Sequence, residues 1–322
     1  MKGPSIIFIA FLNCFILNGQ NDFSKVDEFA RGYKSKTTDV VKLTSDLTSP
    51  FDNDLDKVRS IFIWITNNIQ YDYKEYRKIL NGKKETYKIE AGSKKELAEK
   101  QKKMEEEQHN LSIKNTISKR KGVCQDYSEL FVEMCKNIHI KSGMIDGSVK
   151  TIYGQFIPNN HAWNWVEIKG KTYLLDATWA SGYVDDAKGK YTKEFNDGFF
   201  LTPPSMFVLN HYPSDSKWQL VNDNISLETF KEYPSVGPGF FNFKVKSFSP
   251  KVSKITMKGN QFLISLKFGV KPKALKVSNR GLIIKEFKIN DDDFSASIEL
   301  KKNKNDIDIW GDDELILNYK TK

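Results

Sequence analysis

The sequence predicts an α+β domain followed by a smaller all-β domain. The first observation is a stripe of apolar residues at steps of three and four from Cys124 to Ile138, the spacing of a helix packed on a core. Alternating runs typical of strands come next, around 141–149, 161–168 and 172–179. The third observation is the segment PSVGPG, near 233–239, beyond which every apolar run is strand-like. A helix followed by antiparallel strands is typical of α+β proteins.

The N-terminus predicts an exported protein. Lys2 precedes an apolar run from Ile6 to Leu17, and the chain then turns polar. This run is too short to span a bilayer, whereas a basic start, a short apolar centre and a small residue near its end are typical of a secretory signal. We therefore predict a signal peptide over residues 1–20, a secreted or periplasmic mature chain and no stable membrane insertion.

The α+β domain is predicted to span residues 21–232. A lead-in helix is expected around 26–33, and apolar residues at helical spacing predict a longer one from Asp54 to Ile69, capped by Asp52 or Asp54. The all-β domain is predicted over 240–322. Its short alternating runs indicate a small β-sandwich, with strands at 241–248, 261–268, 281–289, 295–300 and 315–319.

Residues 74–121 are predicted to form a basic helical insertion, exposed to solvent. The segment holds fifteen Lys and Arg against eight Asp and Glu, so most of the net charge of +9 lies there. A solvated helical excursion is the favoured interpretation, and an arm that binds an acidic partner surface is the alternative. Predicted export and the scarcity of aromatic residues for base stacking argue against a nucleic acid partner.

The stretch RKGVCQDYSELF places Cys124 at the start of a predicted helix. Unpaired backbone N–H groups and the positive end of the helix dipole favour a thiolate there, and the same N–H groups stabilise an oxyanion. Asp126 disfavours the thiolate if its carboxylate faces the site. Cys135 lies in the middle of the apolar stripe and is predicted to be a buried core residue. On one helix the two cysteines are about 16 Å apart, which predicts two free thiols.

His161 and Asp176 lie on two predicted strands that form a hairpin. If Lys169 and Gly170 form its two-residue turn, Asp176 lies on the same face as His161, two positions away, and an imidazole and a carboxylate bridge that distance. A cysteine nucleophile needs a base, and the base needs an orienting acceptor. Taken alone, each of these residues has an ordinary structural interpretation. The ordered set of Cys124, His161 and Asp176 favours a catalytic one.

The remaining candidate residues are aromatic or histidine. Tyr127, Trp163 and Trp179 are predicted to line the substrate cleft. His109, His139 and His211 are interpreted as structural or surface residues, the last in a loop. With four scattered histidines and no HExxH, GxSxG, CxxC or Gly-rich phosphate loop, we predict no metal site and no cofactor.

Three motifs together resemble the transglutaminase-like cysteine enzymes, in particular the kyphoscoliosis peptidase type: GVCQDYS, NHAWNWVEIKGKTYLLDATWASG and FFLTPPSMFVLNHYPSDSKWQL. The resemblance extends from about Arg59 to Leu220. It implies a papain-like, transglutaminase-like fold in which Cys124 is the nucleophile, His161 the general base and acid, and Asp176 the residue that orients His161. It also implies that the C-terminal β-sandwich is immunoglobulin-like.

These observations predict an exported enzyme that transfers acyl groups through Cys124. Hydrolysis of peptide or amide bonds is favoured, with a protein or peptide as substrate, because peptidase assignments predominate in this branch of the resemblance. Two alternatives stay open: a transglutaminase that crosslinks proteins, and a binding or scaffold protein that keeps the fold without catalysis. No motif distinguishes water from a lysine amine as the acceptor.

Overall fold

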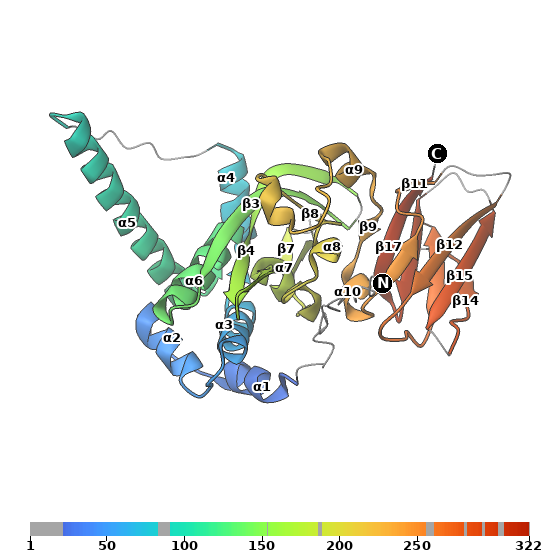
Figure 1. Cartoon of the computed structure of the whole chain (residues 1–322), viewed down its shortest axis with the longest axis horizontal. Coiled ribbons are helices and arrows are strands. Elements are labelled where there is room, and N and C mark those ends of the chain that lie inside the picture. The colour runs from blue at the N-terminus through green and yellow to red at the C-terminus, as the bar shows by residue number, and fades with distance from the viewer. Residues whose placement is uncertain are drawn as a thin grey trace, which may run out of the picture.

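The structure is a computed structural model that describes residues 22–82, 91–152, 154–185, 189–255, 261–279, 282–291, 294–301 and 306–321. Helices and short sheets form about the first three quarters of the chain, and β-strands form the last quarter (Figure 1). The predicted signal peptide over 1–20 lies outside the described residues and stays a prediction. Among the described residues, no helix combines the length and the apolar character that a membrane crossing requires.

Three helices begin the described chain, namely α1 (Ser24–Gly32), α2 (Val40–Thr48) and α3 (Asp54–Asn68). The helices predicted at 26–33 and 54–69 correspond to α1 and α3, whereas α2 was not predicted. The Asn53 side chain caps α3 by accepting the Asp56 N–H, so the prediction of an Asp52 or Asp54 cap is wrong. Nine successive residues of α3, from Val58 to Thr66, are buried, which places this helix at the centre of the core.

An ion cluster around the buried Arg59 joins α1, α3 and the short helix η1 (Asp197–Phe199). The Arg59 guanidinium is bidentate to Asp27, with both N–O distances 2.7 Å, and also contacts Asp197. The side chain of Arg59 is 3% exposed and lies over the rings of Phe23 and Phe200. One cation with two carboxylates therefore ties segments that are far apart in the sequence.

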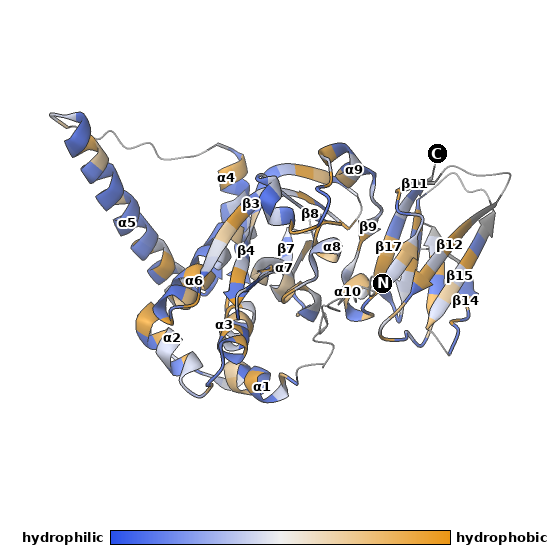
Figure 2. Ribbon diagram, in the orientation of Figure 1, coloured by the Kyte–Doolittle hydropathy of each residue, from blue (hydrophilic) through white to orange (hydrophobic). Residues whose placement is uncertain are grey.

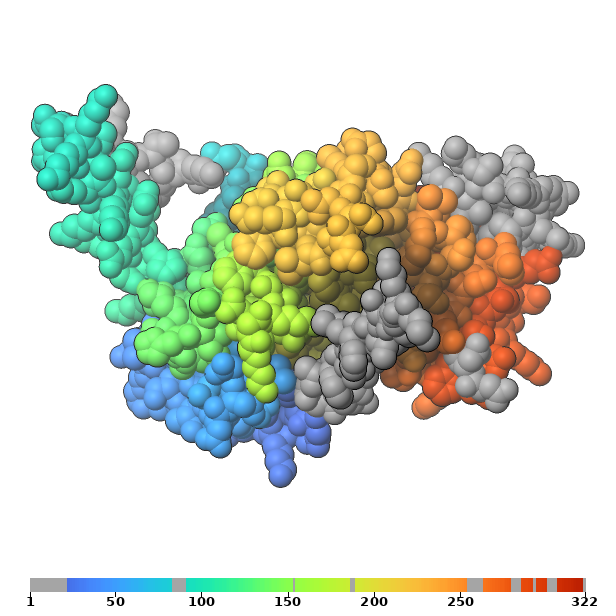
Figure 3. All heavy atoms as spheres, viewed as in Figure 1, coloured from blue at the N-terminus to red at the C-terminus, as the bar shows by residue number. Residues whose placement is uncertain are grey.

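The segment between α3 and α6 contains α4 (Tyr73–Leu80), α5 (Lys94–Lys119) and two short strands, β1 (Gln70–Tyr71) and β2 (Lys121–Gly122). The outer part of α5 stands clear of the body and is hydrophilic along its length (Figures 1 to 3). The helix carries seven lysines and five glutamates, so the exposed helix itself has a nearly balanced charge.

The inner end of α5 belongs to the core. Ile113, Thr116 and Ile117 are buried, and α5 packs on α6 and α2. The prediction of a solvent-exposed insertion therefore holds for the outer turns of α5 and is wrong for its last turns, because these side chains cover the outer face of α6.

The sheet of the first domain has the strand order β5-β4-β3-β8 and is antiparallel. Helix α6 (Cys124–Asn137) packs against it, and Asn164 on β4 donates to the Ser128 carbonyl of α6, 3.0 Å away. The strands are β3 (Ser142–Lys150), β4 (Phe156–Ile168), β5 (Lys171–Leu175) and β8 (His211–Pro213).

The hairpin β4–β5 has the predicted register. Ile168 pairs with Lys171 across a turn of Lys169 and Gly170, and both turn residues have positive φ, 51° and 73°. This conformation is typical of a two-residue hairpin loop. The strand ends at Leu175, earlier than predicted, and Asp176 caps the helix α7 (Ala177–Ser181). Trp179 is therefore on a helix rather than on the predicted strand.

Short elements connect the sheet to the C-terminal region. They are β6 (Gly182–Asp185), β7 (Lys190–Lys193), α8 (Pro204–Phe207), η2 (Ser216–Gln219), α9 (Leu227–Glu232), β9 (Ser235–Val236) and α10 (Pro238–Asn242). The predicted boundary PSVGPG contains β9, which pairs with β17. Gly237 is required there, because a Cβ would lie 2.4 Å from the Leu315 carbonyl oxygen.

The C-terminal region forms two sheets. Their apolar side chains belong to one hydrophobic cluster, which continues into the core of the first domain. One sheet has the order β10-β12-β15, and the other has the order β11-β17-β16-β13-β14 with β9 beside β17. The strands are β10 (Ser247–Ser249), β11 (Lys254–Ile255), β12 (Gln261–Lys267), β13 (Leu275–Asn279), β14 (Leu282–Phe287), β15 (Ser295–Lys301), β16 (Ile307–Gly311) and β17 (Glu314–Thr321).

Most predicted C-terminal strands correspond to observed ones, with two kinds of error. The strand predicted at 241–248 is wrong, because α10 extends to Asn242 and only Ser247–Ser249 forms a strand. Strands β13 and β16 were not predicted. The fold class of mixed helix and sheet with an all-β C-terminal region agrees with the prediction.

Candidate active site

Cys124 is the first residue of α6, as the sequence predicted. Its N-cap, Val123, is extended, with φ −94° and ψ 179°, so the chain enters the helix abruptly and leaves the first N–H groups of the helix without helical partners. The thiol is half-buried, whereas Cys135 is buried, and both cysteines are free. Burial raises the pKa of the Cys135 thiol to about 12, which makes it unreactive at neutral pH.

A short parallel ladder holds the start of α6 in place. Strand β1 pairs with β2 so that Tyr71 lies opposite Gly122, and the Asp72 N–H donates to the Gly122 carbonyl at 2.9 Å. Tyr71 is half-buried. Burial, followed by the negative charge of Cys124, raises the pKa of Tyr71, so its phenol stays protonated beside the thiol.

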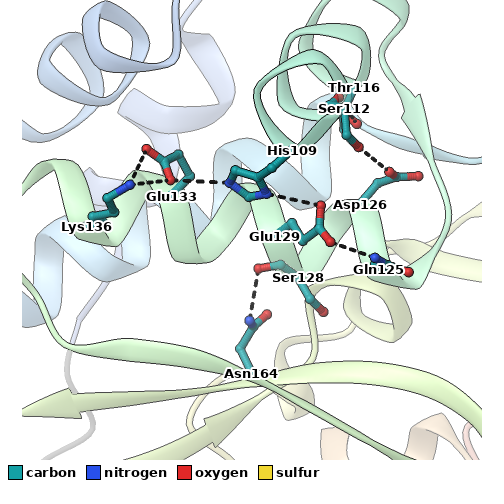
Figure 4. Close-up of polar contacts among 10 residues, drawn as sticks. All are labelled: His109, Ser112, Thr116, Gln125, Asp126, Ser128, Glu129, Glu133, Lys136 and Asn164. Carbon is teal, nitrogen blue, oxygen red and sulfur yellow. Dashed lines mark hydrogen bonds and ion pairs between the residues drawn. The ribbon is translucent and has the colours of Figure 1, made fainter. Parts of the chain in front are cut away.

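Asp126 caps the helix that carries Cys124. Its Oδ2 accepts the Val123 N–H at 2.8 Å, and its Oδ1 accepts the Ser112 hydroxyl of α5 at 3.0 Å (Figure 4). Burial raises the pKa of Asp126. A Cβ on Gly122 would lie 2.6 Å from the Asp126 Cβ, so glycine is required there. Both carboxylate oxygens are thus engaged in the cap and the α5 contact.

Further polar contacts join α5 to α6. His109 of α5 lies between two carboxylates of α6, 3.5 Å from Glu129 and 3.4 Å from Glu133 (Figure 4). Lys136 is 3.1 Å from the same Glu133. The interpretation of His109 and His139 as structural or surface residues fits this placement, since His139 is exposed.

His161 and Asp176 form a buried hydrogen-bonded pair. His161 Nε2 is 2.7 Å from Asp176 Oδ2, and the two side chains are 6% and 0% exposed. Asp176 also caps α7, since its Oδ1 accepts the N–H groups of Thr178 and Trp179 at 2.8 and 3.0 Å. Every oxygen of this carboxylate is therefore hydrogen-bonded, which satisfies the requirement for burying it.

The electrostatics of this pair favour charge on both partners. Burial opposes the charged form of His161, but Asp176 and the Cys124 thiol outweigh it and raise the pKa of His161 to about 10. Burial likewise favours a neutral Asp176, but His161 and His211 hold the pKa of that carboxyl well below its usual range. Because Asp176 engages His161 Nε2, Nδ1 is the nitrogen left to interact with the Cys124 thiol, which contributes to raising the pKa of His161.

His211 also reaches this carboxylate, which the sequence analysis missed. It lies on β8 rather than in the predicted loop, is 1% exposed, and places Nε2 3.0 Å from Asp176 Oδ2. Burial lowers the pKa of His211 to about 4, against the raising effect of Asp176. The only available signal was its presence in the third motif of the resemblance, because nothing local links it to Asp176.

Aromatic rings keep the cluster dry. The His211 ring stacks on Phe207 at 4.1 Å between centroids and lies 4.6 Å from Trp179. His161 lies 5.3 Å from Trp179 and 6.0 Å from Trp163. Water is therefore excluded from the hydrogen bonds to Asp176, which strengthens them.

Two of the three predicted cleft residues are core residues. Tyr127 is fully buried and donates its hydroxyl to the Ile69 carbonyl at 2.8 Å, and Trp163 is 1% exposed. The prediction that they line a cleft is therefore wrong, because a substrate does not reach them. Trp179 is half-buried beside His161 and stays a candidate.

The histidine and aspartate atoms lie close enough for a metal ion to be considered. Ligand atoms of His161, Asp176 and His211 all lie within 4.8 Å of one another. The separations of 2.7 and 3.0 Å from Asp176 Oδ2 are those of hydrogen bonds. Ligands of a tetrahedral ion with bonds of about 2.1 Å are roughly 3.4 Å apart. The cluster is therefore arranged as a hydrogen-bonded network.

Comparison with known proteins identifies the family of this chain. Residues 38–198, half of the chain, match the Transglutaminase-like domain family. The chain belongs to the transglutaminase-like family. Kyphoscoliosis peptidase of Mus musculus is 29% identical over 241 residues, which cover 72% of this chain and 32% of that protein, and the Homo sapiens protein of that name matches equally. The chain thus spans about a third of the length of these curated relatives.

A solved structure described as a TGase is 15% identical to this chain, with a TM-score of 0.28. The match covers 52% of this chain and 35% of that one.

Proposed function

We propose that this transglutaminase-like protein is a cysteine-dependent acyl-transfer enzyme that hydrolyses peptide or amide bonds, with Cys124, His161 and Asp176 as its triad. The observation that carries the proposal is the hydrogen bond of 2.7 Å between His161 and Asp176, made beside a half-buried thiol at the start of a helix. The names of the kyphoscoliosis peptidase relatives favour hydrolysis over crosslinking.

In the first half of the reaction, Cys124 Sγ forms a bond to the substrate carbonyl carbon, and the carbonyl π electrons move to oxygen. The Cys124 backbone N–H, at the start of α6, is placed to stabilise that oxyanion. The C–N bond then breaks, and His161 Nδ1 gives its proton to the leaving amine. A thioester on Cys124 remains.

In the second half, water attacks the thioester carbonyl while His161 accepts its proton. The carbon–sulfur bond breaks, the acid leaves, and the thiolate and imidazolium are restored. Asp176 keeps the imidazole oriented and stabilises its positive charge throughout, as its two hydrogen-bonded oxygens permit. If an amine replaces water, the same steps crosslink two proteins.

We also propose a domain organisation. Residues 21–232 form the transglutaminase-like unit, residues 240–322 form an immunoglobulin-like sandwich, and the mature chain is exported. The two C-terminal sheets, whose apolar side chains belong to one hydrophobic cluster, support the second assignment. The lysines of the exposed part of α5 support an acidic protein surface as partner only weakly, because glutamates nearly balance them.

The test begins with thiol labelling of Cys135→Ala, in which Cys124 is the only cysteine of the chain beyond residue 20. Rapid alkylation at neutral pH that His161→Ala slows by roughly 10²-fold or more supports the triad. Alkylation no faster than that of an unstructured thiol contradicts it.

Turnover is then measured with peptide libraries, with and without an amine donor. Cleavage by the native chain and by Cys135→Ala, but not by Cys124→Ala, supports hydrolysis. Ligation of the amine identifies a transglutaminase. No Cys124-dependent product in either assay leaves the non-catalytic scaffold as the function.

A further inference from the structure

Asp176 Oδ2 accepts hydrogen bonds from two imidazoles. Its distances to His161 Nε2 and His211 Nε2 are 2.7 and 3.0 Å, and all three side chains are nearly inaccessible to solvent. The triad mechanism needs only the first of these contacts. His211 is therefore a buried, titratable group in the site without a role in the proposed reaction.

The sheet topology brings the two histidines to one face. His161 on β4 pairs with Gly147 of β3, and His211 on β8 pairs with Val149 of the same strand. The pairing of β3 with β8 is regular from Gly147 to Val149, although its pairing with β4 is irregular there. Residues two apart on a strand point to the same face, so both rings lie on the face of β3 where Asp176 accepts their hydrogen bonds. Gly147 has no side chain between them, and a Cβ there would lie 2.6 Å from the Trp163 ring.

The Asp176 carboxylate determines which nitrogen of each imidazole carries hydrogen. Asp176 is ionised, so Oδ2 only accepts, and Nε2 carries hydrogen in both histidines. His211 donates in this way whether its ring is neutral or charged. Burial and the charge of His161 favour the neutral form.

Few other charged groups face His211. His161 on β4 and Asp176 at the start of α7 interact with it directly, and Cys124 on α6 acts through His161. The nearest strand, β3, carries Lys150, but its ammonium group donates to the carbonyls of Phe230 and Tyr233. The rings packed on His211 from other elements are uncharged.

The other ring nitrogen also has a partner. His211 Nδ1 lies 2.6 Å from the Asn210 amide oxygen, while the Asn210 amide nitrogen is buried with no partner in the described part of the chain. In the neutral ring with hydrogen on Nε2, Nδ1 is an acceptor. Exchanging the positions of the Asn210 amide oxygen and nitrogen would place the amide N–H as a donor to Nδ1. The Phe207 backbone also hydrogen-bonds the ring and acts to raise its pKa, so it is the Asp176 carboxylate rather than Asn210 that requires hydrogen on Nε2.

We propose that His211 is a positioning residue for the acyl-transfer reaction, in which its N–H holds the Asp176 carboxylate toward His161 and limits how tightly His161 retains its proton. The inference rests on the proposed function. By sharing the carboxylate, His211 weakens the stabilisation that Asp176 gives the His161 imidazolium. His161 thus releases its proton to the leaving amine more readily.

The test is nitrogen NMR of protein labelled with ¹⁵N-histidine, which gives signals from only four histidines. Native protein is compared with His211→Gln, which keeps an N–H donor near the Nε2 position, and with His211→Met, which has similar volume and no donor. In His211→Met, His161 is expected to lose its proton at a pH higher by roughly one unit, the order of one lost charge-assisted hydrogen bond. His211→Gln is expected to titrate like the native protein.

The rate of Cys124 alkylation against pH is measured on the same three proteins, and its alkaline step is expected to move with the His161 signal. The inference is overturned if His161 titrates identically in His211→Met, or if native His211 lacks hydrogen on Nε2. It is also overturned if the Gln and Met variants, both folded by circular dichroism, shift His161 equally. The proposed function fails separately, if native Cys124 is not activated by His161.

Discussion

Two ion clusters in this protein each surround a buried charged side chain, and the two central charges have opposite signs. They differ in burial, because Asp197 of the Arg59 cluster is 61% exposed. Asp176 is one anion with two imidazole partners, His161 and His211, and Arg59 is one cation with two carboxylate partners, Asp27 and Asp197. Both link elements that are distant in the sequence. They differ in chemistry, since imidazoles change charge near neutral pH whereas a guanidinium does not.

The clusters also differ in what lies beside them. The Asp176 cluster adjoins a half-buried thiol at the start of α6, and the Arg59 cluster adjoins the rings of Phe23 and Phe200. Burial and pairing alone therefore do not distinguish a site from a structural ion cluster. A functional site is indicated where the paired groups are titratable and lie next to an accessible nucleophile.

The largest expected effect comes from Asp176→Asn. The amide loses the charge that stabilises the His161 imidazolium, so the proposed activity is expected to fall roughly 10²- to 10⁴-fold. Steady-state cleavage of a peptide found in the library screen measures this. Unchanged turnover in a folded variant would contradict the role of Asp176.

Arg59→Met is expected to act on stability instead. Removing the guanidinium leaves Asp27 without its bidentate partner. Because the Asp27 and Asp197 side chains are 21% and 61% exposed, the cost is expected to be smaller than the roughly 3–5 kcal/mol of a fully buried pair. Urea unfolding measures the loss, and activity per folded molecule is expected to stay at the native level. A loss of activity without a loss of stability would remove the distinction between the clusters.

The third expectation is that the two imidazoles contribute to stability in opposite directions on either side of pH 6.5, the ordinary histidine pKa, while Lys150, whose pKa burial lowers to about 7, opposes the contribution of His161 on the alkaline side. The pKa of His161 is raised to about 10 in the folded state, so its contribution is complete below pH 6.5 and is lost as pH rises toward 10. The pKa of His211 is lowered to about 4, so the unfolded state binds more protons between pH 6.5 and 4, and stability falls as pH falls through that range.

Urea unfolding as a function of pH tests this, with each variant compared with native protein. Taken as a difference from native protein, the effect of His211→Gln is expected to change between pH 4 and 6.5, and that of His161→Gln between pH 6.5 and 10. Arg59→Met should lower the whole curve without changing its shape. Parallel curves for all four proteins would show that the imidazoles do not set the pH dependence.

The smallest effect is expected from the exposed ion pairs of α5. Lys100 and Glu96 are 2.7 Å apart, as close as the buried pairs, but their side chains are 49% and 45% exposed. Lys100→Gln is therefore expected to leave the urea unfolding curve unchanged within the error of the measurement. A loss comparable with that of Arg59→Met would show that proximity matters more than burial.

The sequence by itself determined the features that depend on local periodicity and turn chemistry. The apolar stripe after Cys124 predicted α6, and Lys169 and Gly170 predicted the hairpin register that brings His161 toward Asp176. Both predictions use residues within a few positions of one another, where helical and strand periods dictate which side chains share a face.

Only the tertiary structure decided which side chains are accessible and which distant residues join the cluster. Tyr127 and Trp163 looked suited to a cleft but are buried in the core. His211 reaches Asp176 across 35 positions of sequence, and Tyr71 reaches the start of α6 through the β1–β2 ladder. Such contacts depend on how strands are ordered in a sheet and how loops close, and neither leaves a periodic signal in the sequence.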